Sequence, residues 1–284
     1  MRMRVTTDRL AVPGASLHYE VRGAGPALLI IPSGNGDAAP FVPLAETLSD
    51  EYTVITYDRR GFSRSPLDGP VGDDRLADDA HDIGALLRHL ATGQAAVFGS
   101  SSGAIVALAT LERHPDLVHT VVAHEPPLAS VLPDAEQWLG FYAELYETYQ
   151  REGVDAARKA FRSGMGMETT TKPPRRTELP PDELAEMLGR IRRNHVFWFE
   201  HELRPYPAYR PNLRLLKSFS DKLVLAGDGT TPDRFPYRPN TVLAEHTGNP
   251  IVHLPGGHVG YVTQPDEFAV ALREIIRQDS RVPR

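Results

Sequence analysis

The stretch Ala95-Ala96-Val97-Phe98-Gly99-Ser100-Ser101-Ser102-Gly103 decides the interpretation of the fold, because it joins a short apolar run to the helix-like segment 102–113. Its last five residues fit the pattern G-x-S-x-G, with Ser101 at the centre. In that pattern a sharp strand-to-helix turn exposes the central serine, and the flanking glycines prevent side-chain collisions. The pentapeptide alone could also be a Ser/Gly linker or a simple N-cap. The strand before it and the helix after it favour a nucleophile elbow.

Segments typical of strands and helices alternate on both sides of this turn. The expected strands are 6–12, 16–22, 27–31, 52–57, 95–98, 118–123, 222–226 and 251–254, and the expected core helices are 41–49, 75–90, 102–113, 240–246 and 266–277. The run 27–31 is apolar throughout, as in a strand buried on both faces. The alternation predicts an α/β fold with a mostly parallel central sheet and helices on both faces.

The alternation stops between about residues 133 and 212, where only helical segments are expected. Tyr142 belongs to one of them, 184–199 forms another, and the connection 164–181 between them is rich in Gly, Thr and Pro and is expected to be flexible. We therefore expect a core domain formed by residues 1–130 and 215–284, with a helical lid at 131–214. Such an insertion would cover the ligand end of the sheet.

Composition excludes several classes of protein. The 284 residues are 41% hydrophobic, enough for a large buried core, and the formal net charge is −6. An acidic chain lacks the basic footprint of a nucleic-acid binder, and an anionic membrane would repel it. The absence of cysteine excludes disulfides, thiolate nucleophiles and Cys-type metal sites.

The sequence also bears on location. The basic residues at the N-terminus precede no apolar segment typical of a signal peptide, and the run 27–31 is too short to cross a bilayer. We expect a cytoplasmic protein whose partner is a small-molecule substrate, with no nucleic-acid or membrane partner. No feature of the sequence indicates an oligomeric state.

A serine hydroxyl needs a base to become a nucleophile, and His258 is the best placed of the eleven histidines. It lies in the loop 255–261, after the last expected strand and before the last helix. Open parallel sheets bind ligands at the carboxyl ends of their strands, so this loop favours a general base over an ordinary loop histidine.

An acyl-transfer site also needs donors for an oxyanion. One is the backbone N–H of the residue after the nucleophile, here Ser102, and the other comes from the loop after the third strand. In the loop 32–37 our candidate is Gly34, although an ordinary glycine turn would have the same sequence.

The order of strands, elbow, helical insertion and late histidine resembles the α/β-hydrolase fold, and residues 57–65 resemble the turn after its fourth strand. Within that superfamily the chain is similar to fungal lactone hydrolases that open the mycotoxin zearalenone. Short patches carry this likeness: Pro32-Ser33-Gly34, Ser101-Ser102-Gly103-Ala104, His114-Pro115-Asp116, His124-Glu125, and Trp198 after Asn194. The lid sequence and much of the surface depart from those enzymes.

The acid of the triad has two candidates. In many α/β-hydrolases it lies two residues beyond a Gly-Asp pair after the seventh strand, but Thr230 occupies that position here. The resemblance to lactone hydrolases implies Glu125, directly after the sixth strand. If strands five to eight lie side by side, Glu125 would emerge between the Ser101 and His258 strands. Asp228 is the alternative.

The predicted function is a serine hydrolase that cleaves a carboxylic ester or lactone through an acyl-enzyme on Ser101, without a metal or other cofactor. Trp198, Phe197 and Tyr142 in the lid are candidates for substrate binding, although they could equally pack inside the lid. A cofactor-free perhydrolase or haloperoxidase would use the same triad. An epoxide hydrolase or dehalogenase usually has Asp at the elbow, which Ser101 argues against. A non-catalytic ligand receptor on the same fold is the alternative from another class.

Overall fold

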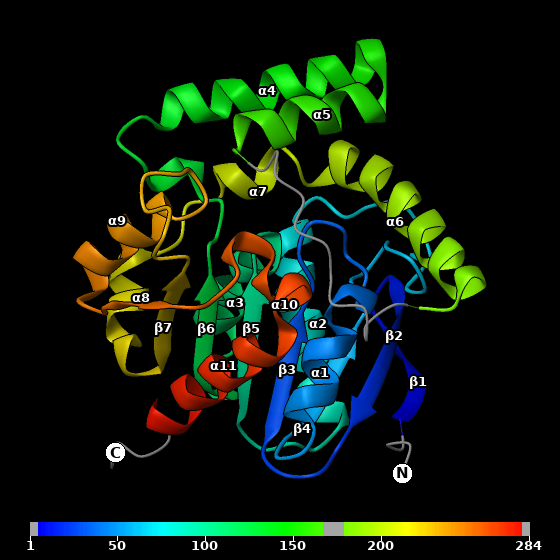
Figure 1. Cartoon of the computed structure of the whole chain (residues 1–284), viewed down its shortest axis with the longest axis vertical. Coiled ribbons are helices and arrows are strands. Elements are labelled where there is room, and N and C mark those ends of the chain that lie inside the picture. The colour runs from blue at the N-terminus through cyan, green and yellow to red at the C-terminus, as the bar shows by residue number, and fades with distance from the viewer. Residues whose placement is uncertain (1–4, 167–178, 280–284) are drawn as a thin grey trace.

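The computed structural model describes residues 5–166 and 179–279 of the chain, so most of the expected connection 164–181 lies outside the described residues. One sheet of eight strands forms its centre, in the order β1-β2-β4-β3-β5-β6-β7-β8 (Figure 1). The strands are β1 (Val5–Val12), β2 (Ala15–Arg22), β3 (Ala27–Ile31), β4 (Thr53–Tyr57), β5 (Ala95–Ser100), β6 (Val118–His124), β7 (Leu223–Gly227) and β8 (Ile251–His253).

The sheet is mostly parallel, as predicted. β1 and β2 form an antiparallel hairpin, and β2 pairs antiparallel with β4. From β4 through β3, β5, β6 and β7 to β8 all neighbours are parallel. Every residue of β3 is buried, which agrees with its uninterrupted apolar sequence because helices cover both faces of a central parallel strand.

Two groups of helices cover the two faces. On one face α2, α3, α8 and α9 pack on a core that includes Ile83, Leu108, Leu216 and Leu243. On the other, α1, α10 and α11 pack on a second core around Phe268. The core helices are α1 (Val42–Leu48), α2 (Arg75–His89), α3 (Ser102–Arg113), α8 (Leu213–Ser218), α9 (Arg238–Thr247), α10 (Gly260–Thr263) and α11 (Pro265–Asp279). No helix among the described residues is both long and apolar enough to span a membrane.

Helices without strands fill the described part of the chain between β6 and β7, which includes the segment that the sequence predicts to be a lid. They are α4 (Ala135–Glu152), α5 (Val154–Gly164), α6 (Pro181–His201) and α7 (Pro205–Ala208). α4, α5 and α6 lie over one end of the strands (Figure 1). They share a separate apolar cluster that includes Tyr142, Leu145, Phe199 and Leu203. The lid also contacts the core through Asn194, whose amide nitrogen donates to the carbonyl of Asn35 at 2.7 Å.

The register of the strands brings their carboxyl ends to the same level. His124, at the end of β6, pairs with Ser100 of β5 on one side and with Ala226 of β7 on the other. The residues that follow these strands therefore emerge side by side, beneath the lid.

Candidate active site

Ser101 lies in the tight turn between β5 and α3. Its backbone has φ 56° and ψ −124°, a conformation that non-glycine residues rarely adopt. The flanking glycines make this turn possible, because a Cβ at Gly99 would lie 2.2 Å from the carbonyl oxygen of Gly103, and one at Gly103 would lie 2.5 Å from that of Ile31. The Ser101 N–H donates to the carbonyl of His124 at 2.9 Å, which fixes the turn to β6.

Glu125, directly after β6, forms a hydrogen bond with His258. The His258 Nδ1 lies 2.6 Å from the Glu125 Oε2, and the carboxylate is 2% exposed. Its other oxygen accepts the backbone N–H of Asp228 at 2.7 Å. Burial alone would raise the pKa of the Glu125 carboxyl, but the hydrogen bond and charge of His258 lower it to about 2. The carboxylate is therefore ionised and oriented toward the histidine at neutral pH.

Asp228, the alternative acid, has different partners. Its carboxylate accepts hydrogen bonds from the N–H and hydroxyl of Thr230 and from the hydroxyl of Thr231. Among the described residues no hydrogen bond joins this carboxylate to His258. Only the backbone of Asp228 contributes to the pair, through its bond to Glu125.

Gly34 and Ser102 lie together at the elbow. A Cβ built on Gly34 would come within 3.2 Å of the Ser102 hydroxyl and 2.8 Å of the Trp198 Nε1, so a larger residue here would displace the Trp198 side chain. In the described part of the chain neither the Gly34 nor the Ser102 N–H donates to a protein acceptor. These are the two N–H groups that the sequence predicts as oxyanion donors.

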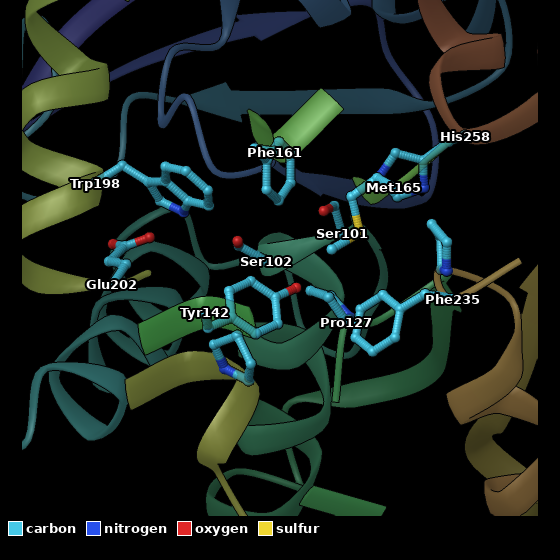
Figure 2. Close-up of a pocket in the computed structure, with 12 residues that line it drawn as sticks. Ser101, Ser102, Pro127, Tyr142, Phe161, Met165, Trp198, Glu202, Phe235 and His258 are labelled. Atoms are coloured by element: carbon cyan, nitrogen blue, oxygen red, sulfur yellow. The ribbon is translucent and has the colours of Figure 1, made fainter. Parts of the chain in front are cut away.

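A small cavity lies over Ser101 and is lined by residues of both the core and the lid (Figure 2). Its volume is about 20 Å³, space for one or two water molecules, so a larger ligand can enter only if lining side chains move apart. Ser101 and His258 both line it, but no direct hydrogen bond joins them among the described residues. Such bonds often form only when substrate is bound. The lining consists of Ser101, Ser102, Pro127, Tyr142, Phe161, Met165, Trp198, Glu202, Pro207, Phe235, Pro236 and His258.

Two of the three lid residues predicted to bind substrate, Tyr142 and Trp198, line this cavity, whereas Phe197 does not. The Phe197 ring packs edge-on against Phe62, with centroids 4.9 Å apart, and lies under the Arg75 guanidinium at 4.7 Å. Adjacent residues of an α-helix point about 100° apart, so Trp198 and Phe197 cannot both face the cavity. Phe197 instead joins the lid to the core.

Several cavity residues were not anticipated from the sequence. Phe161 and Met165 come from α5 and its C-cap, whereas Phe235 comes from the connection between β7 and α9. Each would look like an ordinary core residue in its own segment. Glu202, at the end of α6, looks like a surface residue in the sequence but is completely buried. Among the described residues, no cluster of three or more His, Cys, Asp or Glu side chains could hold a metal ion.

His124 lies behind His258, and its burial makes a prediction about acid stability. The two rings stack with centroids 6.2 Å apart, and the Nδ1 of His124 lies 3.0 Å from the Ser100 hydroxyl. Burial lowers the pKa of His124 to about 4. In the unfolded chain the His124 ring takes up a proton near pH 6.5, whereas in the folded protein it does so only near pH 4. The free energy of unfolding is therefore highest above pH 6.5 and decreases as the pH falls toward 4. His124 alone should account for a loss of about 3 kcal/mol between pH 7 and pH 4.

We therefore expect His124→Phe to unfold in urea with a smaller difference in stability between pH 7 and pH 4 than the wild-type protein. The change at pH 7 measures the lost contacts, and the difference between the two pH values isolates the protonation. His246→Gln, at an exposed histidine, is the control. An unchanged pH difference in His124→Phe would show that other groups cause the acid sensitivity.

These features define a class of protein. An elbow serine after β5, a histidine after β8 and a helical insertion after β6 characterise the α/β-hydrolase architecture, and the family model described as alpha/beta hydrolase fold matches residues 26–197. The chain belongs to the α/β-hydrolase fold family and is a hydrolase of that superfamily.

Similarity to individual proteins extends over nearly the whole chain. The "Uncharacterized hydrolase YraK" of Bacillus subtilis is 33% identical, with 98% of this chain and 99% of the relative covered. A zearalenone hydrolase of Cladophialophora bantiana is 28% identical, with 97% and 98% covered. Among solved structures, a thermophilic esterase from Thermogutta terrifontis has a TM-score of 0.71 at 21% identity, with 96% and 99% covered, and supports the fold.

Proposed function

We propose that this protein is a serine hydrolase that cleaves an apolar carboxylic ester or lactone. The observation that carries the proposal is the 2.6 Å hydrogen bond between the buried Glu125 carboxylate and His258, in a site where His258 shares a cavity with the elbow serine Ser101. A histidine oriented in this way can take a proton from a serine hydroxyl, and the carboxylate stabilises the imidazolium that results.

The proposed reaction proceeds through an acyl-enzyme. His258 takes the proton of the Ser101 hydroxyl, and the Ser101 Oγ attacks the carbonyl carbon. The N–H groups of Gly34 and Ser102 then stabilise the oxyanion, which is usually a large contribution in such sites. His258 returns the proton to the leaving alcohol as the ester C–O bond breaks. Water, deprotonated by the same histidine, cleaves the acyl-enzyme and releases the carboxylic acid.

The lining of the cavity supports an apolar substrate. Aromatic and apolar side chains from the lid, among them Tyr142 and Trp198, face Ser101 across the cavity (Figure 2). The similarity to zearalenone hydrolases supports a lactone, and the likeness to an esterase is one of fold. A panel of lactones of different ring size, together with p-nitrophenyl esters of graded length, is the test of substrate class.

The same panel separates this proposal from the alternatives. The serine hydrolase should turn over esters or lactones and be labelled at Ser101 by a phosphonate probe. A ligand receptor on the same fold would bind without turnover. A perhydrolase or haloperoxidase would show halogenation that depends on peroxide. Absence of hydrolysis across the whole panel would contradict the proposed function.

Trp198→Ala tests the contribution of the lid to substrate choice. Because the indole is half-buried and lines the cavity, its loss should change the ratio of kcat/KM for bulky aromatic and small esters by about tenfold. The melting temperature should change only slightly compared with this substrate ratio, since only part of the Trp198 ring packs in the lid. Phe197→Ala is the matched control, because this neighbour packs against Phe62 outside the cavity. A lower melting temperature with an unchanged substrate ratio in Trp198→Ala would assign Trp198 to packing.

A further inference from the structure

A buried charged side chain, Glu202, forms part of the wall of the cavity. It lies beside Trp198, on the side of the cavity away from His258 (Figure 2). Apart from the candidate catalytic residues and the Tyr142 hydroxyl, the remaining lining is apolar or aromatic. Ligand sites of this kind fix orientation through a few placed polar groups, so a carboxylate in an apolar wall indicates a specific contact.

Two arginines hold the Glu202 carboxylate in place. Its Oε1 accepts three hydrogen bonds, from the Arg59 Nη2 at 2.7 Å and from the Arg75 Nε and Nη2 at 2.9 and 2.7 Å. Its Oε2 accepts one, from the Arg59 Nη1 at 3.0 Å. Asp79 also pairs with Arg59, at 2.6 Å. Two arginines therefore pair with two carboxylates in this buried cluster, so the Glu202 side chain has partners that hold it in place without a ligand.

The four hydrogen bonds are divided unevenly between the two oxygens of the Glu202 carboxylate. Each carboxylate oxygen offers about two lone-pair positions. Oε1 is saturated by three donors, whereas Oε2 has one donor among the described residues and keeps an acceptor position free. A cationic ligand group here would be repelled by Arg59 and Arg75, and an anionic group by Glu202 itself. The group that suits this position is a neutral hydrogen-bond donor.

We propose that the Glu202 Oε2 accepts a hydrogen bond from a neutral O–H or N–H group at the end of the substrate remote from the scissile carbonyl, and so selects apolar esters or lactones that carry such a donor. This inference rests on the proposed hydrolase function and makes it more specific. In this arrangement Ser101 acts on one end of the substrate while Glu202 recognises the other.

The first test uses the wild-type protein. It compares p-nitrophenyl esters of ω-hydroxy acids with the matched ω-methoxy esters over a series of chain lengths. At the length that reaches Glu202, the hydroxy ester should have a kcat/KM about tenfold higher, the effect of one hydrogen bond to a charged acceptor. No preference at any chain length would overturn the inference.

Glu202→Gln should abolish this preference. The amide oxygen of Gln must occupy the Oε1 position, because three N–H donors point at it. The amide NH₂ then occupies the Oε2 position, so the free acceptor becomes a donor. The ratio of hydroxy to methoxy ester should fall to about one. Asp79→Asn is the matched control, since it alters the same charge cluster without lining the cavity, and it should keep the preference.

Glu202 is not the recognition group if the preference for hydroxy esters survives in Glu202→Gln, or if Asp79→Asn loses this preference to the same extent. A third contrary outcome is a shorter variant that prefers the same chain length as the wild-type protein. The shorter variant is Glu202→Asp, which serves if Glu202→Gln does not fold. It withdraws the carboxylate by one methylene and should move the preference to a longer hydroxy ester. The hydroxy and methoxy compounds should also be titrated against Ser101→Ala by tryptophan fluorescence. If Ser101→Ala binds the hydroxy compounds more tightly than the methoxy compounds while the wild-type protein hydrolyses no ester, the proposed reaction is wrong and the recognition by Glu202 stands.

Discussion

Ser101→Ala is expected to lower kcat/KM for the best ester or lactone by about 10⁴-fold or more, because it removes the atom that forms the acyl-enzyme. The fold should remain intact, since the substitution only deletes a hydroxyl that has no hydrogen bond in the described structure. Steady-state kinetics and thermal unfolding of the same preparation measure both effects.

Ser102→Ala is the informative comparison for this variant. Ser102 is proposed to contribute through its backbone N–H, which alanine keeps, so the loss of activity should stay below about tenfold. If Ser102→Ala abolishes turnover and Ser101→Ala does not, the nucleophile has been assigned to the wrong serine. The phosphonate label would then be found on the neighbouring residue.

The core of the fold could be predicted because local sequence and tertiary structure agree there. The apolar run of β3 and the glycines around Ser101 permit few conformations, and alternating strands and helices define a parallel sheet with covered faces. α8 (Leu213–Ser218) spans the boundary that the sequence predicts between lid and core at residues 214 and 215, and its Leu216 packs in the core on one face of the sheet.

The features of the site that could not be predicted from the sequence depend on contacts between distant segments. Arg59 and Glu202 are 143 residues apart, and neither has a local pattern that identifies a buried ion pair. Phe197 was predicted to bind substrate together with Trp198, because helical spacing gives the angle between adjacent side chains but not which of them faces the cavity. The choice between Glu125 and Asp228 depends on the register of β6 and β7, which determines which carboxylate reaches His258.

The two candidate acids make opposite predictions when each carboxylate is replaced by its amide. Both Glu125 oxygens accept from donors, one from His258 and the other from the Asp228 N–H. Gln has only one oxygen, and a backbone N–H cannot change its role. In Glu125→Gln the NH₂ group must therefore face His258 and force its proton onto Nε2, the atom that has to accept the Ser101 proton. Turnover should fall by about 10⁴-fold, as in the analogous change in a serine-protease triad.

Asp228→Asn should cost less than about tenfold, because asparagine keeps one oxygen for Thr230 and Thr231, and the Asp228 backbone bond to Glu125 is unchanged. The two variants should be compared across pH. Without the Glu125 charge an imidazolium is less favourable, so the residual activity of Glu125→Gln should persist to lower pH on the acid side than that of Asp228→Asn. If Asp228→Asn is instead the crippled enzyme and Glu125→Gln is nearly normal, the catalytic carboxylate is Asp228, and the Glu125–His258 hydrogen bond has a structural role only.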